Sequence, residues 1–210
     1  MKPPISSPEP SPQAIADHLL TAIANFESLP PIYALMVNGL QQGLGVERVL
    51  LVQYSTLPHQ IGRIVDQATA PSIPLLKELD AEADASWFPL LPQLPDQGLW
   101  AIGDREQETL QPIQREFCQA LGLKSVLHLP IRLERRQWGC VSVQQLTTAR
   151  PWTTTDLQFV YRLGQLLCLG LTHAEMTIRS YNQTASVQTI LAQSHYQKDC
   201  LLYTSPSPRD

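Results

Sequence analysis

The sequence predicts an α+β domain in which helices cover one face of an antiparallel sheet. Three observations support this class. Apolar residues recur at helical spacing near both ends of the chain. Between these segments lie short runs rich in β-branched residues and bounded by turn residues. Two of the runs, 124–132 and 137–146, are separated only by a charged turn, which is typical of a β-hairpin.

Two helices are expected to open the domain. Ser11 and Pro12 suit the N-terminus of a helix, and apolar residues follow at steps of three and four: Ile15, Leu19, Ile23 and Phe26. A second helix is expected after the Pro30–Pro31 pair, ending at the glycines of 43–45. Both alternating sets of residues in the following strand, 46–54, are largely apolar, so we expect both of its faces to be covered.

The middle of the chain is less regular. Residues 60–66 are the expected hairpin partner of the preceding strand. Residues 70–97 contain five prolines and are expected to form a long loop with short helices, of the kind that lies over a pocket. A short strand at 98–102 and a helix at about 111–121 then lead into the hairpin.

A long helix is expected to begin near Thr153. Its apolar residues form one stripe at the steps of three and four found in coiled coils: Leu157, Val160, Leu163, Leu167, Leu171, Ala174, Ile178 and Tyr181. Exposed on a lone helix, this stripe would leave apolar surface in water. We therefore expect a parallel homodimer that buries the stripe from Leu157 to Ile178.

Composition excludes several kinds of partner. The chain has 210 residues, a formal net charge of −4 and 43% hydrophobic residues, enough for a buried core. Its scattered Lys and Arg make nucleic acid an unexpected partner. No apolar run approaches the roughly 18 residues of a membrane span. With no signal peptide, and with four Cys at spacings that indicate neither a disulfide framework nor a zinc site, we expect a cytoplasmic protein without a metal.

No catalytic signature is present. The chain lacks a Gly-rich phosphate loop, HExxH, GxSxG and the kinase motifs, so we expect this part of the protein not to be an enzyme and to carry no catalytic residue.

The residues resemble a GAF domain. The resemblance rests on the order of elements, the strand 46–54, the Leu129–Pro130–Ile131 strand, the Trp138–Gly139 strand and a helix that opens near 152–156. It covers about 29–175 and is nearest to the GAF domains of cyanobacterial phytochrome-related sensors. It implies a six-stranded antiparallel sheet with the N- and C-terminal helices on one face and a ligand pocket under loops on the other.

The resemblance also bears on cofactors. In bilin-binding members of the family, a Cys followed by His attaches the chromophore, and that pair falls on Ile113 and Gln114 here. Neither residue supplies a thiolate. Cys118, the first Cys in the chain, lies further along the same expected helix and would face a different direction. Covalent bilin is therefore disfavoured, no cofactor is expected, and an unidentified small molecule is the remaining ligand.

Five residues are candidate ligand contacts around the expected pocket: Tyr54, Trp87, Phe88, Trp100 and His128. His128 lies between Leu127 and Leu129 in a strand and so faces the opposite side from both. Two interpretations stay open for each. His128 is either a ligand contact or a hydrogen-bonded core histidine, and the aromatic residues either stack on a ligand or form the core under the loop.

These observations divide the chain into five parts: a disordered leader (1–12), an N-terminal helix (13–28), the GAF domain (29–175), a signalling or linker helix (176–199) and a tail (200–210) that resembles the translation of a sequencing adapter. The expected function is a sensory or regulatory module at the N-terminal input end of a truncated signal-transduction protein. A histidine kinase is the first expectation for the missing effector, before a diguanylate cyclase or phosphatase. The alternatives are a ligand-free dimerisation or scaffold module, or a bilin photosensor with non-canonical attachment.

Overall fold

The computed structural model describes residues 11–25, 28–54, 62–76, 98–134 and 136–203. Its elements are α1 (Pro12–Ala24), α2 (Leu29–Leu44), β1 (Arg48–Tyr54), β2 (Gly62–Thr69), β3 (Trp100–Ile102), α3 (Pro112–Ala120), β4 (Ser125–Leu133), β5 (Arg136–Gln145) and α4 (Thr154–Tyr203). The helices and strands expected outside 70–97 are present, with ends shifted by a few residues. Most of the expected leader (1–12), of the expected loop with short helices (70–97) and of the expected tail (200–210) lies outside the described residues. The chain divides after Leu171 into a first unit that holds the sheet and a second unit that begins within α4.

The sheet is antiparallel, and its five strands have the order β2-β1-β5-β4-β3. The expected β4–β5 hairpin is confirmed, with His128 opposite Ser142. The prediction of six strands is wrong for the described residues. Residue patterns alone indicated only five strands, and the sixth came from the family resemblance. β3 forms one edge of the sheet, whereas β1 lies inside it and is covered on both faces as expected.

Helix ends follow the local sequence. The Ser11 hydroxyl caps α1 by accepting a hydrogen bond from the backbone N–H of Ala14 at 3.2 Å. α2 ends at Gly45, whose φ of 60° lies in the left-handed region that glycine adopts without strain. Because α2 ends at Gly45, the chain turns there and enters β1 at Arg48.

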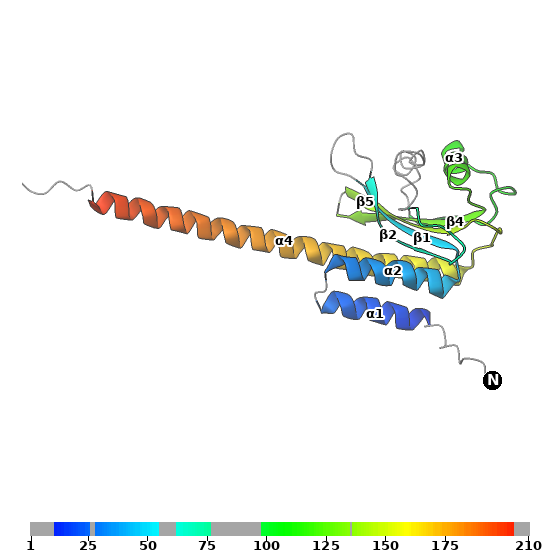
Figure 1. Cartoon of the computed structure of the whole chain (residues 1–210), viewed down its shortest axis with the longest axis horizontal. Coiled ribbons are helices and arrows are strands. Elements are labelled where there is room, and N and C mark those ends of the chain that lie inside the picture. The colour runs from blue at the N-terminus through cyan, green and yellow to red at the C-terminus, as the bar shows by residue number, and fades with distance from the viewer. Residues whose placement is uncertain (1–10, 26–27, 55–61, 77–97, 135, 204–210) are drawn as a thin grey trace, which may run out of the picture. The chain divides into compact units, whose positions relative to one another are not determined.

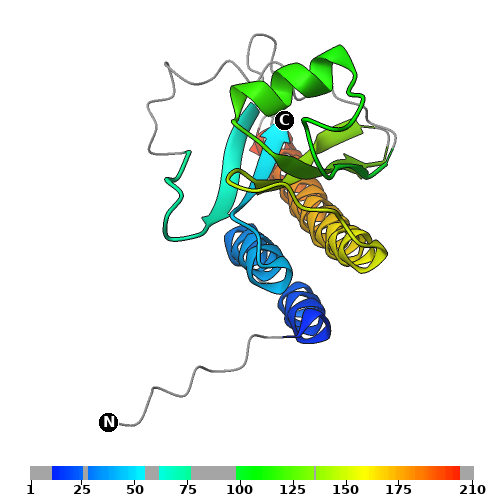
Figure 2. The same ribbon diagram turned by 90° about the vertical axis from the view of Figure 1, so that its right-hand side faces the viewer.

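Helices cover one face of the sheet in two layers. α2 and the start of α4 lie against the strands, and α1 packs on their outer side (Figure 2). Close approach is possible because a Cβ at Gly39 would lie 2.4 Å from a methyl of Ile15. The core here is continuous from α1 to the sheet, and its fully buried side chains include Leu19, Met36, Leu40, Leu127, Leu163 and Leu167.

The first part of the α4 stripe, up to Leu171, belongs to this core, whereas Ile178 and Tyr181 further along it are exposed. Val160, Leu163, Leu167 and Leu171 are each at most 2% exposed. The expectation that they are free to pair with a second copy is therefore wrong. A helix packed on a sheet and a helix in a coiled coil show similar apolar spacing, so the pattern alone did not separate the two cases. The homodimer itself stays a prediction.

The opposite face of the sheet is covered by α3 (Figure 1). A second cluster of buried apolar residues forms there, with Phe117 and Cys118 from the helix packed over strand residues that include Leu50, Val52 and Cys140. Helices therefore lie on both faces of the sheet, although the terminal helices share one. No helix in the described part of the chain combines the length and apolar character needed to cross a membrane.

Candidate functional site

The sheet face under α3 carries a row of buried polar side chains. Arg48, His128, Ser142 and Gln144 are each at most 3% exposed. They lie together because of the strand register: His128 pairs with Ser142, and Gln144 pairs with Arg48. A buried polar group destabilises the fold unless it is hydrogen-bonded. The hydrogen-bond partners of these side chains therefore separate the polar atoms that are satisfied within the protein from those that a ligand could satisfy.

Three of the four side chains in the row are hydrogen-bonded to one another. Arg48 Nε donates to Gln144 Oε1 at 2.6 Å, and Gln144 Nε2 donates to Ser142 Oγ at 2.8 Å. Burial lowers the pKa of the Arg48 guanidinium to about 10, which still leaves it charged at neutral pH. Sequence reasoning missed these three residues. Polar residues at alternate positions of a strand are also typical of a strand with one face in water, so the sequence did not mark Ser142 and Gln144 as buried.

His128, the fourth member of the row, packs between aromatic rings. The ring centroids of His128 and Trp100 lie 4.9 Å apart with planes 23° apart, and Phe117 contacts His128 edge-on. His128 faces away from Leu127 and Leu129, as its position predicts. Within the described structure, neither His128 Nδ1 nor Trp100 Nε1 has a hydrogen-bond partner. Burial lowers the pKa of His128 to about 3, so the imidazole is neutral.

Tyr54 lies on the same face at the end of β1. Its buried hydroxyl has the Cys140 thiol as a polar neighbour but makes no hydrogen bond of good geometry among the described residues. Burial raises the pKa of Tyr54, and it raises the pKa of the Cys140 thiol to about 12. Three of the five candidate contacts are thus brought to one face, each with a buried polar atom that lacks a partner. The other two, Trp87 and Phe88, lie outside the described residues.

α3 supplies no thiolate to this face. Cys118 is buried in the apolar cluster under α3, and Ile113 is partly buried against the same cluster. Burial raises the pKa of the Cys118 thiol to about 11, which keeps it protonated at neutral pH. Low reactivity at this position therefore follows from burial rather than from direction alone.

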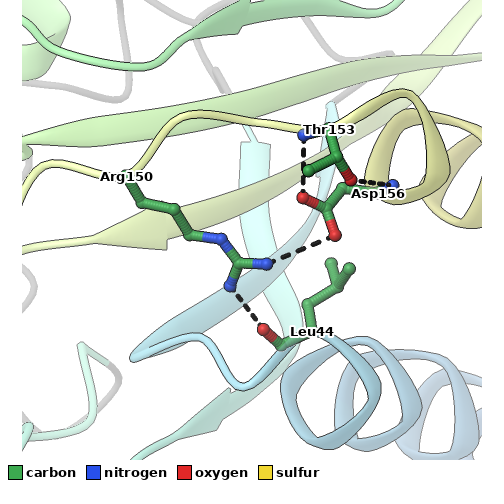
Figure 3. Close-up of polar contacts among 4 residues, drawn as sticks. All are labelled: Leu44, Arg150, Thr153 and Asp156. Atoms are coloured by element: carbon green, nitrogen blue, oxygen red, sulfur yellow. Dashed lines mark hydrogen bonds and ion pairs between the residues drawn. The ribbon is translucent and has the colours of Figure 1, made fainter.

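A second polar cluster lies where β5 leads into α4 (Figure 3). The Arg150 guanidinium donates to the carbonyl oxygen of Leu44 and lies 3.2 Å from Asp156 Oδ1. Asp156 Oδ2 accepts from the Thr153 N–H at 2.9 Å, and Thr153 Oγ1 accepts from the Asp156 N–H at 3.1 Å. The reciprocal bonds between Thr153 and Asp156 cap the N-terminus of α4. Arg150 connects this cap to the end of α2.

A cavity of about 540 Å³ lies beside this cluster, between β3, the turn at 103–108 and residues 149–152. One acidic residue of its lining, Glu108, is bound to the backbone, because its Oε1 accepts the N–H groups of Gly103 and Asp104 at 2.6 and 3.1 Å. In the part of the chain that the structure describes, His, Cys, Asp and Glu form no group of three that could hold a metal ion. The unpartnered polar atoms under α3 are therefore the stronger candidate for ligand binding.

Comparisons with known proteins agree with this architecture. A model of the GAF domain family matches residues 28–171. The circadian input-output histidine kinase CikA of Thermosynechococcus vestitus is 21% identical over 182 residues, a match that covers 84% of this chain and 25% of CikA. The chain thus spans about a quarter of the length of that curated relative.

Solved structures of similar fold include two cyanobacterial domains. The photoproduct state of GAF3 from Slr1393 of Synechocystis sp. PCC6803 has a TM-score of 0.61 at 18% identity, covering 72% of this chain and 98% of that one. The phycoerythrobilin-bound GAF domain of a cyanobacterial phytochrome has a TM-score of 0.64 at 15% identity, covering 82% and 98%. At sequence identities of 18% and 15%, the similarity shows a shared fold only.

Proposed function

The chain belongs to the GAF domain family, and we propose that it is a sensory domain that binds a small planar molecule on the sheet face under α3. One observation carries this proposal: His128 Nδ1, Trp100 Nε1 and Tyr54 Oη are buried on that face without hydrogen-bond partners among the described residues. Each such atom costs about 1–3 kcal/mol when unsatisfied, so a ligand that pairs with them would stabilise the domain. Flat aromatic neighbours favour a planar ligand.

The chemistry of this face favours reversible binding. The thiols of Cys118 and Cys140 are protonated at neutral pH, and the position of the family's attachment Cys is Ile113. A tetrapyrrole of the kind named for the phycoerythrobilin-bound relative would have to be held without a thioether bond. The domain itself then has no catalytic role, and its output is a change of conformation.

The relation to CikA supports a place in a longer protein. We propose that the domain is the input part of a signal-transduction protein whose effector is a histidine kinase, because the matched segment makes up only 25% of that kinase. Recovery of the gene sequence beyond residue 199 tests this directly. A downstream kinase module is expected, and a cyclase, a phosphatase or the end of the gene would overturn it.

We also propose a homodimer, with a different surface from the stripe expected at first. Leu20 on α1 and Tyr161 and Leu169 on α4 are 46%, 50% and 51% exposed. The two helices lie beside each other, since Arg162 Nη1 donates to Gln13 Oε1 at 2.7 Å. Each of these three large apolar side chains is exposed on the helices that lie outside the sheet, and a second copy would cover them.

Binding is tested with biliverdin as the probe. The purified chain is mixed with biliverdin, passed through gel filtration and examined by absorbance, then denatured and examined for zinc fluorescence after electrophoresis. We expect a complex that survives filtration and leaves no fluorescent band. Trp100→Leu should weaken it about tenfold, whereas Glu116→Gln, on the exposed side of α3, should not. No bound probe, or equal affinity in Trp100→Leu, would overturn a tetrapyrrole site here.

A further inference from the structure

We propose that β3 is a relay strand, which carries a change at Trp100 to the first turn of α4. The proposal rests on the proposed function only for the source of that change, a ligand beside Trp100. The relay itself is a property of the contacts among β3, residues 150–152 and the start of α4.

The relay begins with an edge strand. β3 has three residues and, among the described strands, pairs with β4 alone. Trp100 at its start stacks on His128, and Ile102 at its end is buried in the cluster under α3. A strand this short is held by few ladder hydrogen bonds, so it shifts at a lower free-energy cost than the interior strands.

The carbonyl groups at the end of β3 hold the segment that precedes α4. Ile102 O accepts a hydrogen bond from Trp152 Nε1 at 2.9 Å. Gly103 O accepts from the Arg150 backbone N–H at 3.1 Å and from Ser125 Oγ at 2.7 Å. A displacement of the strand by part of an ångström would lengthen and bend these hydrogen bonds. It would therefore weaken them, because hydrogen-bond strength falls steeply as the donor–acceptor angle departs from linear.

Arg150 and Trp152 then connect this point to the helix. The Arg150 guanidinium carbon lies 5.0 Å from the centre of the Trp152 ring, and the same guanidinium contacts Asp156 in the first turn of α4 (Figure 3). Asp156 is also the residue that closes the helix cap with Thr153. In the proposed relay, the hydrogen bond from Trp152 Nε1 to Ile102 O is the contact that a shift of β3 would weaken.

Hydrogen exchange measured without any ligand tests the relay. In Trp100→Leu, the amides of the first turns of α4 should exchange about fivefold faster than in the wild type, with α2 unchanged. The matched control is Val52→Ala, which removes bulk from the same apolar cluster on an interior strand. Val52→Ala should not raise amide exchange selectively in the first turns of α4. His128→Phe, which alters the other side of the stack, provides a second variant if Trp100→Leu fails to fold.

A second change identifies the route. Trp152→Phe removes the indole donor to Ile102, so adding Trp100→Leu to it should produce no further increase in exchange at the start of α4. Unchanged exchange there in Trp100→Leu and His128→Phe, an equal increase in Val52→Ala, or additive effects of Trp100→Leu and Trp152→Phe would each overturn the relay. Because no ligand is used, this result is independent of the biliverdin experiment. The exchange data can support the relay when biliverdin does not bind, and they can contradict it when biliverdin binds.

Discussion

Acidification should destabilise this domain through His128. The side chain is 1% exposed, and burial lowers its pKa from 6.5 to about 3 in the folded state. The aromatic rings that pack on it, Trp100 and Phe117, carry no charge that could stabilise an imidazolium against the aqueous reference. Because the folded-state pKa is the lower one, the contribution to stability is complete above about pH 6.5 and is lost as the pH falls toward about 3.

The magnitude follows from proton linkage. Between about pH 7 and about pH 5 the unfolded chain binds nearly one proton at this position and the folded chain binds almost none, which lowers the free energy of unfolding by about 2 kcal/mol. Completing the titration would bring the loss to about 5 kcal/mol, at about 1.4 kcal/mol for each pKa unit. For a domain of marginal stability, that loss is a large share of the whole.

Urea denaturation of the wild type and of His128→Phe at a series of pH values measures the effect. Phenylalanine keeps a flat ring against Trp100 but does not titrate, so the stability of this variant should fall by about 2 kcal/mol less than that of the wild type between about pH 7 and about pH 5. His18→Gln removes an exposed histidine of α1 and should follow the wild type. Equal pH dependence in the wild type and His128→Phe would refute the reasoning.

Four further outcomes are expected. Gly139→Ala should lose about 3 kcal/mol of stability by chemical denaturation, because its Cβ would lie 1.9 Å from the Val52 carbonyl oxygen and backbone must move. Leu163→Ala, at a fully buried site, should lose about 3 kcal/mol in the same assay. Cys118 should resist a thiol reagent in the native protein at pH values well below 11 and react rapidly in urea, as read by mass spectrometry. By light scattering, Leu169→Glu should be a folded monomer where the wild type is a dimer, and a monomeric wild type would contradict the dimer.

The fold was largely predictable because local patterns and tertiary structure agree. Ser11 caps α1 as its side chain predicts, and the paired strands β4 and β5 follow from two apolar runs around a short turn. Register within the hairpin then decides which residues meet across strands, such as His128 and Ser142. Periodicity of single segments carries no information on register, so the buried row under α3 emerged only from the structure.

The candidate site was predictable only in part, because a single strand does not show which of its faces another element covers. His128 was identified because a titratable residue in an apolar strand is conspicuous, whereas Ser142 and Gln144 are ordinary residues for a strand with one face in water. Both faces of β5 are covered here, which turns these two side chains into buried groups that need partners. Whether a polar residue in a strand is solvated or buried depends on a helix distant in sequence, α3, and no pattern within β5 reports on it.

The first part of the α4 stripe shows that periodicity alone does not identify what buries a helix face. Apolar residues at steps of three and four specify that one face of the helix is buried, and Leu163 and Leu167 are indeed fully buried. They do not specify what buries it, and the sheet of the same chain takes that role. Beside the sheet, the exposed apolar residues of α4 are Tyr161 and Leu169, which are half exposed, and beyond Leu171 the stripe residues Ile178 and Tyr181 are exposed as well. A charge at position 167 should therefore unfold the monomer, whereas a charge at position 169 should only separate two copies, so the two substitutions distinguish core from interface on one helix.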